Sequence, residues 1–377
     1  MDPLDPDSPV QLAFAHFLNN VESLATSKGE RRSMLAAQRR SRRARWHRGL
    51  PCMWPSCSVT SIPRSHSVPA AAQLHRIAEG GHVSTPMSVH AGGRAAMRVD
   101  GVGVNIASTF PGFCQVHERA FASFEQTGRI ASRRDFALTF FRAVCREVRV
   151  REEQVRLFVG LRADQQRRYE ERLEHLFAQS LRAADLPLGR VDFRALLAEH
   201  DERIECPFAS LLGPPIDAIG GVAAAFRTQF LDPLGSEVLD GPTLLHMAAV
   251  RAPRRFPVSI CGPANVLRPT APASDDFVSW VLCWPVDDGT IVAICAPREQ
   301  AGYAEAYFRR WTETPERLAT MIDLWIAQGT EAWFMRPSVW NSLAPATRMR
   351  VESNLNDTTP RSINAKPDVS LFGPPIA

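Results

Sequence analysis

The segments that decide how this chain is interpreted are Cys52-Met53-Trp54-Pro55-Ser56-Cys57 and Phe113-Cys114-Gln115-Val116-His117. The first segment has two thiols with four residues between them, and Pro55 and Ser56 favour the tight turn that lets both sulfurs face one ion. The second segment is a C-x-x-H pair that leads into a predicted helix. Three cysteines and one histidine form the closed ligand set that proteins use for structural zinc. We therefore expect Cys52, Cys57, Cys114 and His117 to bind one Zn²⁺.

The stretch between the two ligand pairs supports this expectation. Residues 50–112 are rich in Pro, Gly, Ser and His and poor in large apolar side chains. A bound metal would supply folding free energy that so small a core cannot. Short strands are predicted at Ala96–Val99 and Val102–Ile106, on either side of a turn at Asp100-Gly101. A thiol pair, a β-rich stretch and a second pair at a helix N-terminus is the layout of a treble-clef zinc finger. The alternative is that the four residues are buried independently.

The rest of the chain alternates between segments with a helical pattern and segments with a β-strand pattern. Strong helical periodicity predicts helices at Asp135–Val148 and 152–184, and shorter helices follow at 191–200 and 216–231. Beyond residue 252 a strand is predicted at Phe256–Ile260. A β-hairpin follows, with strands at 277–284 and 290–296, and helices are predicted at 299–311 and 315–328. The predicted fold class is α+β: a treble-clef-like zinc module, a mainly helical region, and a C-terminal α/β region with a β-hairpin.

These patterns suggest five regions along the chain. An amphipathic helix and an Arg-rich segment occupy residues 1–49. The zinc module is predicted at 50–130 and the helical region at 131–235. The α+β region is predicted at 236–350, and a polar tail at 351–377.

Basic residues are concentrated before the first ligand pair. Nine Lys or Arg residues and one acid lie between Lys28 and Arg48, whereas the whole chain has a net charge of only +4. The arginines from Arg31 to Arg48 could neutralise several phosphates of DNA or RNA, which is a salt-dependent mode of binding. A solvated helix or a flexible arm is the alternative. The single aromatic residue there, Trp46, gives no indication of base stacking.

Composition limits the compartment and the role of the other cysteines. The chain is 45% hydrophobic and 22% charged, as in ordinary globular proteins. It has no run of eighteen apolar residues, so no membrane span is expected. The acidic N-terminus does not resemble a secretory signal, and a cytoplasmic location is expected. In a reducing compartment cysteines stay free. The remaining five are expected to be core residues: Cys145, Cys206, Cys261, Cys283 and Cys295.

The ligand segments also resemble a family of nucleases. A cysteine pair, a His-containing strand, an Asn and a Cys-x-x-His pair opening a helix are similar to the zinc-supported HNH, or ββα-metal, nucleases. The resemblance implies that His66 is the general base, that Asn105 orients the hairpin and that Glu118 helps to bind a catalytic Mg²⁺ or Mn²⁺. HNH enzymes usually have a histidine where this chain has Glu118. The resemblance covers about residues 50–125. A structural role for His66 and His82 remains the alternative.

A second resemblance covers more of the chain. Several short segments look like those of uncharacterised bacterial proteins with an N-terminal zinc-knuckle module. The matching residues are Cys52, Cys57, Ser65-His66-Ser67-Val68, Gly81-His82-Val83, Ala107-Ser108, Phe110, Gly112-Phe113-Cys114, His117-Glu118, Phe121, Phe124-Glu125 and Met335–Trp340. This resemblance implies a domain layout and no mechanism.

Two functions follow as expectations. The first is a zinc-stabilised nucleic-acid-binding protein, or a degenerate HNH-like endonuclease, in bacterial defence against mobile DNA. The second is a non-enzymatic scaffold in which zinc folds the N-terminal module. In that case the helical region would bind protein partners or a second copy of the chain.

Overall fold

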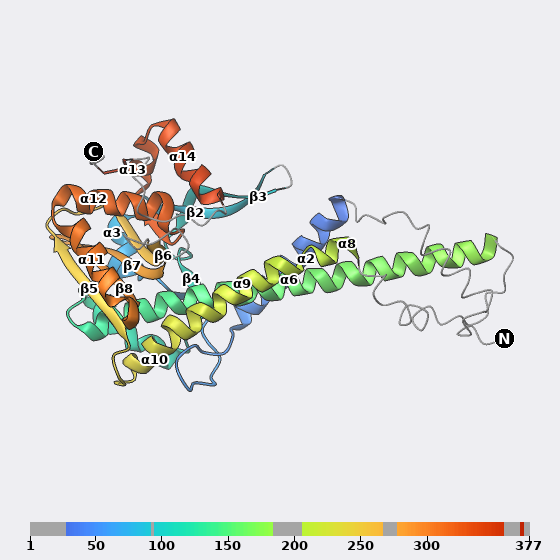
Figure 1. The fold of residues 1–377 in the computed structure, drawn as a ribbon, viewed down its shortest axis with the longest axis horizontal. Coiled ribbons are helices and arrows are strands. Elements are labelled where there is room, and N and C mark those ends of the chain that lie inside the picture. The colour runs from blue at the N-terminus through green and yellow to red at the C-terminus, as the bar shows by residue number, and fades with distance from the viewer. Residues whose placement is uncertain (1–27, 92–93, 184–205, 267–276, 358–369, 373–377) are drawn as a thin grey trace. The chain divides into compact units, whose positions relative to one another are not determined.

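A computed structural model describes most of the 377-residue chain. The described residues are 28–91, 94–183, 206–266, 277–357 and 370–372. They divide into two compact units (Figure 1). The first comprises the described residues up to Arg45 together with 151–183 and 206–223, and the second comprises the described residues of 46–150 and from 224 onward. The amphipathic helix predicted within residues 1–49, over residues 9–26, lies outside the described residues, as does the helix predicted at 191–200.

The first unit is helical. Its elements are α2 (Lys28–Arg48), the later part of α6 (Arg133–Ala183), α8 (Pro207–Ser210) and α9 (Gly213–Phe226). Met34 of α2 packs against Leu157 and Leu161 of α6. The Arg-rich stretch is helical throughout α2. The helices predicted separately at Asp135–Val148 and 152–184 form one continuous helix, because no Gly or Pro interrupts residues 149–151.

The second unit is built on a seven-stranded antiparallel sheet. Its strand order is β3-β2-β9-β6-β7-β8-β5. The strands are β2 (His82–Ala91), β3 (Arg94–Gly103), β5 (Leu245–Ala252), β6 (Val258–Val266), β7 (Phe277–Val286), β8 (Gly289–Pro297) and β9 (Trp333–Met335). The predicted hairpin is confirmed as β7–β8, in which Val286 pairs with Gly289 across Asp287-Asp288. This observation establishes the α+β class with an antiparallel sheet.

The two faces of this sheet bury different cores. In β7, Trp280, Leu282 and Trp284 point to one core, while Val281 and Cys283 point to the other. The first core includes the start of α6, η4 (Arg227–Leu231) and α10 (Asp232–Val238). The second core lies under α11 (Ala301–Thr312), α12 (Pro315–Leu324) and η7 (Trp325–Gly329) (Figure 1). The central strands are therefore apolar on both faces, which explains their near-continuous hydrophobic sequence.

A separate two-stranded antiparallel ladder precedes Cys114 and His117 in the chain. Strand β1 (Ser65–His66) pairs with β4 (Thr109–Phe110). Between them the chain forms η1 (Ala70–Leu74) and α3 (His75–Ile77), and then enters the large sheet as β2 and β3. After β4 the helical segments are α4 (Gln115–Glu118), η2 (Arg119–Phe121) and α5 (Ala122–Thr127). Regions predicted as separate, 50–130 and 236–350, thus contribute strands to one sheet.

The predicted turn at Asp100-Gly101 is wrong. Strand β3 runs without interruption from Arg94 to Gly103 and pairs along its whole length with β2. The hairpin connection falls between Ala91 and Arg94. The Asp-Gly pair resembles a hairpin turn, but the strand that pairs with residues 94–103 lies upstream, so tertiary pairing overrides the local signal.

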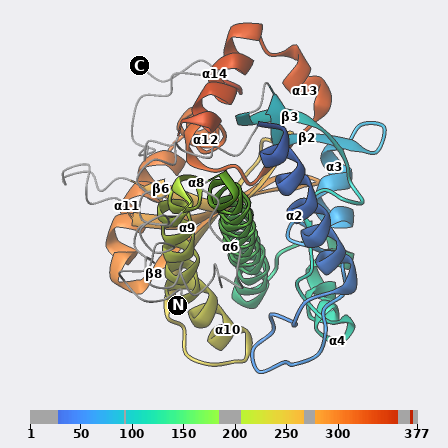
Figure 2. The same ribbon diagram turned by 90° about the vertical axis from the view of Figure 1, so that its right-hand side faces the viewer.

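The C-terminal part of the second unit covers the sheet edge and one core. Helices α13 (Pro337–Ser342) and α14 (Pro345–Asn356) lie beside the β2–β3 hairpin (Figure 2), and η6 (Arg298–Gln300) precedes α11. Buried Asp323 of α12 accepts a hydrogen bond from the backbone N–H of Leu371 at 3.0 Å. Arg254 donates to the carbonyl of Phe372 at 2.6 Å. These two bonds hold residues 370–372 against α12 and against the connection between β5 and β6.

No helix among the described residues combines the length and the apolar character that crossing a lipid bilayer requires. The five cysteines that were predicted to be core residues are all buried and unpaired. The five predicted regions stay a prediction about the chain's organisation.

Candidate metal centre

Four side chains from two distant segments converge in the second unit. One ligand atom each from Cys52, Cys57, Cys114 and His117 lies within 4.8 Å of all the others. The Nδ1 atom of His117 is 3.6 Å from the Cys52 sulfur and 3.3 Å from the Cys114 sulfur. Bonds of about 2.3 Å to sulfur and about 2.0 Å to nitrogen would separate the ligand atoms of a tetrahedral zinc site by roughly 3.5–3.8 Å. The predicted ligand set is therefore close enough to bind one metal ion.

A tight β-turn presents the first thiol pair. The backbone N–H of Cys52 donates to the carbonyl of Val59 at 2.9 Å, and that of Cys57 donates to Trp54 at 3.1 Å. Ser56 adopts a left-handed conformation with φ of 60°. A small polar residue tolerates this conformation better than a β-branched one. The Pro-Ser sequence thus turns the chain between the two sulfurs.

The second pair opens a helix. Cys114 has extended backbone angles directly before α4, and His117 lies in its first turn. The buried sulfur of Cys52 accepts hydrogen bonds from the N–H groups of Trp54 and Cys114, at 3.5 and 3.3 Å. Burial raises the pKa of the Cys52 thiol to about 12. Burial also opposes ionisation of Cys114, but the N–H groups of His117 and Val116 outweigh it and lower the pKa of that thiol. The helix start is therefore arranged to stabilise a thiolate.

An aromatic cluster supports the ligands. The indole of Trp54 stacks on the His117 ring, with centroids 4.9 Å apart and planes 5° apart. The same indole meets Phe121 and Phe141 edge-on. Phe113, next to Cys114, is fully buried in the same cluster. These contacts fix the orientation of the imidazole before any ion binds.

Two buried arginines of α6 hold the segments that carry the ligands. Arg142 forms ion pairs with Glu118 of α4 and Glu125 of α5. Its guanidinium carbon lies 4.5 Å from the centre of the Phe121 ring. Arg149 donates at 2.5 Å to the carbonyl of Pro51, the residue before Cys52. Arg142 and Arg149 are seven residues apart and therefore lie on one helix face. Two arginines on one face of α6 thus bind the segments that carry the two ligand pairs.

His66, the predicted general base, lies on β1 close to this network. Its Nδ1 atom is 3.0 Å from the carbonyl of Ala107, so this nitrogen carries the hydrogen and donates it. Its Nε2 atom has no hydrogen-bond partner among the described residues. Burial lowers the pKa of His66, and the charge of Arg142 lowers it further. His66 is therefore neutral near pH 7, with Nε2 as its basic atom.

The other two residues predicted to be catalytic lie in different settings. Glu118 is paired with Arg142, and its Oε2 atom is buried without a hydrogen bond. Burial raises the pKa of the Glu118 carboxyl, and the Arg142 charge opposes this. Asn105 is exposed in the turn between β3 and β4. Within the described ranges, His66 and Glu118 do not belong to a second cluster of three or more His, Cys, Asp or Glu side chains that could hold a metal ion. Their catalytic roles stay predictions.

Trp54, Arg142 and Arg149 belong to the centre but were not predicted. One signal in the sequence was available: Arg142 is the one charged residue in the mainly apolar stretch from Phe136 to Cys145, and an arginine on the buried face of a helix needs a carboxylate partner. The chain matches no protein-family model, no curated protein and no solved structure.

Proposed function

We propose that this chain is a zinc-folded protein that binds nucleic acid. The observation that carries the proposal is the convergence of three thiols and one imidazole within 4.8 Å. Thiolate and imidazole ligands in a closed set of four suit Zn²⁺ and leave no open position for substrate. The metal is then structural, and its binding free energy folds the ligand segments.

We further propose that the centre is a treble clef with an HNH-like core, as in the bacterial proteins with an N-terminal zinc-knuckle module. The order of elements supports this. A turn bearing two cysteines is followed by β1 and β4, and then by a helix bearing Cys114 and His117. The long separation between β1 and β4 is accounted for by the β2–β3 hairpin, which joins the large sheet.

The nucleic-acid surface that we propose is the outward face of α2. On the inward face Arg45 pairs with Glu153 of α6 at 3.1 Å. Arg40 and Arg43 are exposed, and neither has a hydrogen bond or an ion pair to any described residue. They lie three residues apart and so share one side of the helix. Two unpaired arginines on one face can each neutralise a phosphate.

A degenerate HNH-like endonuclease is the second candidate. The free Nε2 of His66 favours it, because a neutral imidazole with one exposed lone pair can activate water. The ion pair between Glu118 and Arg142 counts against it, since that carboxylate already has a cation. We therefore propose binding without cleavage. The non-enzymatic scaffold, which binds protein and no nucleic acid, is the alternative that the experiment distinguishes.

The experiment measures metal content and binding on the full chain. Elemental analysis should give about one zinc per chain. Fluorescence anisotropy with a 20-base-pair DNA and an RNA of equal length, over a salt series, should show salt-dependent binding. Replacing Arg40 and Arg43 by Gln should reduce the slope of log K against log salt by roughly 2. The control replaces Arg309 of α11, which is paired with Glu305, and Arg317 of α12, which is paired with Glu313.

The outcomes separate the three functions. Zinc with no binding at low salt would favour the scaffold. An equal loss of affinity in the control would refute the assignment to α2. Mg²⁺-dependent or Mn²⁺-dependent nicking of plasmid DNA that His66→Ala abolishes would establish the nuclease.

A further inference from the structure

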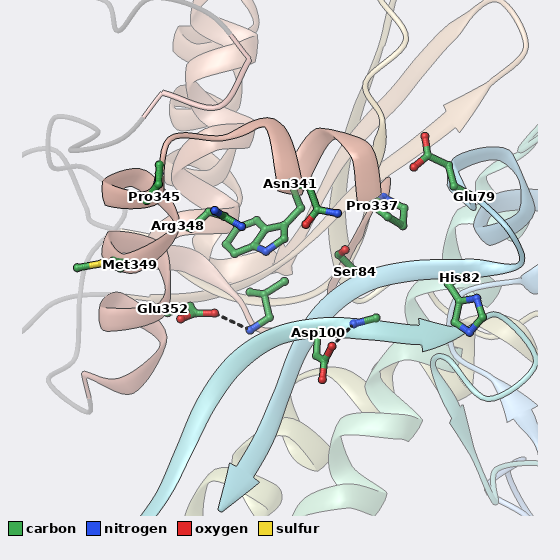
Figure 3. Close-up of a pocket in the computed structure, with 13 residues that line it drawn as sticks. Glu79, His82, Ser84, Asp100, Pro337, Asn341, Pro345, Arg348, Met349 and Glu352 are labelled. Carbon is green, nitrogen blue, oxygen red and sulfur yellow. Dashed lines mark hydrogen bonds between the residues drawn. The ribbon is translucent and has the colours of Figure 1, made fainter. Parts of the chain in front are cut away.

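The second unit contains an open groove that the metal centre does not use. It lies between the β2–β3 hairpin on one side and helices α13 and α14 on the other (Figure 3). Its volume is about 520 Å³, within the range of roughly 300–1,000 Å³ that is typical of small-molecule sites. The groove is therefore large enough for a compact organic molecule.

Side chains fix both ends of the groove. At one end Glu79 accepts hydrogen bonds from the backbone N–H of Ser338 at 2.7 Å and from its hydroxyl at 2.6 Å, which caps α13. At the other end Glu352 accepts from the N–H of Val99 at 3.1 Å. Asn356 bonds both backbone groups of Met97, at 2.7 and 2.8 Å. The walls are thus linked at each end, and the space between them is preformed.

One cation on the groove wall has no partner. Arg348 of α14 is half-buried, and its Nε atom is buried without a hydrogen bond. Its guanidinium forms no ion pair or hydrogen bond with any described residue, although Glu352 lies one turn further along the same helix. In Figure 3 Arg348 and Asn341 come from the helices on one side, and Ser84 lies on the strand opposite. An unpaired guanidinium beside neutral polar groups favours a carboxylate ligand.

The other residues that line the groove limit the charge and polarity of the ligand. Trp340, Met349 and Val99 supply apolar surface. Two carboxylates, Glu79 and Glu352, already accept N–H donors but keep their negative charge, and Asp100 adds a third to the rim. Glu79 also has Arg336 at 3.9 Å, but Asp100 and Glu352 still give the groove more negative than positive charge, which would repel a ligand with several anionic groups. We propose that the groove binds a small molecule with a single carboxylate and an apolar body, with the carboxylate on Arg348.

Gly101 offers a way to fill the groove without disturbing the chain. It lines the groove on β3, and a Cβ atom placed on it would have no heavy atom within 4 Å. Valine suits a strand, and its side chain would start from this open position and occupy ligand space. Gly101→Val is therefore a blocking variant that should fold normally.

The test uses 4-phenylbutyrate as the probe, with its neutral amide and citrate as matched comparisons. Isothermal titration calorimetry and saturation-transfer NMR at pH 7 should detect 4-phenylbutyrate and not the amide. Arg348→Gln should weaken binding about tenfold or more. Gly101→Val should abolish it, and the exposed control Arg298→Gln should leave it unchanged. L-phenylalanine is added as a second carboxylate, and tighter binding of it would identify an amino acid as the ligand class.

Three outcomes would overturn the proposal. One is the absence of detectable binding of 4-phenylbutyrate and of L-phenylalanine at ligand concentrations of about 10 mM. Another is binding that both Arg348→Gln and Gly101→Val leave intact, when thermal melts show that both variants are folded. The third is tighter binding of citrate, since the groove would then accept a polyanion.

Discussion

Replacing Arg142 by Met should destabilise the second unit strongly. The Arg142 side chain is 2% exposed, and its partners Glu118 and Glu125 are 21% and 26% exposed. Removing one partner from a fully buried ion pair costs about 3–5 kcal/mol. The partial exposure of both carboxylates lets water relieve some of this penalty, whereas loss of the contact with Phe121 adds to it. We expect about 3 kcal/mol, a large part of the roughly 5–15 kcal/mol that stabilises a typical domain.

The assay is urea unfolding of the metal-loaded protein, followed by circular dichroism. A triple variant with Arg142→Met, Glu118→Gln and Glu125→Gln removes the cation together with both charges. It should recover to within about 1 kcal/mol of wild type, because no buried charge is left without a partner. Arg317→Met breaks an exposed pair with Glu313 and should cost roughly 0–1 kcal/mol. The reasoning fails if Arg142→Met costs no more than Arg317→Met, or if the triple variant is no more stable than the single one.

Three further predictions concern single residues. Cys114→Ser should lower zinc content from about one per chain to near zero, whereas Cys145→Ala, which alters a buried thiol outside the ligand set, should retain it in elemental analysis. Burial raises the pKa of Asp323 to about 7, so the stabilisation that its proton confers is complete below about pH 4 and is lost as the pH rises to 7. In urea titrations the free energy of unfolding of Asp323→Asn, relative to that of the wild type, should therefore rise by up to about 4 kcal/mol over this range. Gly289→Ala should cost about 3 kcal/mol in the same assay, because φ is +148° and the new Cβ would lie 2.1 Å from the carbonyl oxygen of Ala252; a cost below about 1 kcal/mol would contradict that geometry.

The sequence predicted local features whose cause is local. The four ligands could be selected because thiols and imidazoles at short spacing have few other uses in a reducing compartment. The β7–β8 hairpin could be predicted because two apolar runs flank Asp287-Asp288-Gly289. In both cases neighbouring residues determine the structure.

Features that depend on distant pairing were missed. Strand β5 has alanine and methionine at several positions and a mixed burial pattern, so its alternation is weak. The strand predicted at Phe256–Ile260 ends too early, since β6 continues through Gly262 and Pro263 to Val266. In the structure β9 pairs only with Val258–Ile260, so Pro263 lies beyond the end of that neighbour, where no N–H is needed.

In the candidate site, too, the features with a local cause could be predicted and those that depend on distant contacts could not. Arg142 could have been suspected from its apolar neighbours, but its two carboxylate partners lie 24 and 17 positions earlier. The spacing of residues along α6 does not indicate which segment faces it. The groove between β2–β3 and α13–α14 gave no signal at all, because its walls come from opposite ends of the chain.

The insertion of β2 and β3 between β1 and β4 has a consequence for biosynthesis. The chain leaves the small ladder, enters the large sheet and returns to supply Cys114 and His117. Within that sheet Thr85 donates to the carbonyl of Trp333, 248 positions later. A ribosome therefore releases all four ligands long before the strand that completes their surroundings exists. Contacts of such separation form slowly, so an early-bound ion would hold the emerging N-terminal half together while the rest of the protein is still being made.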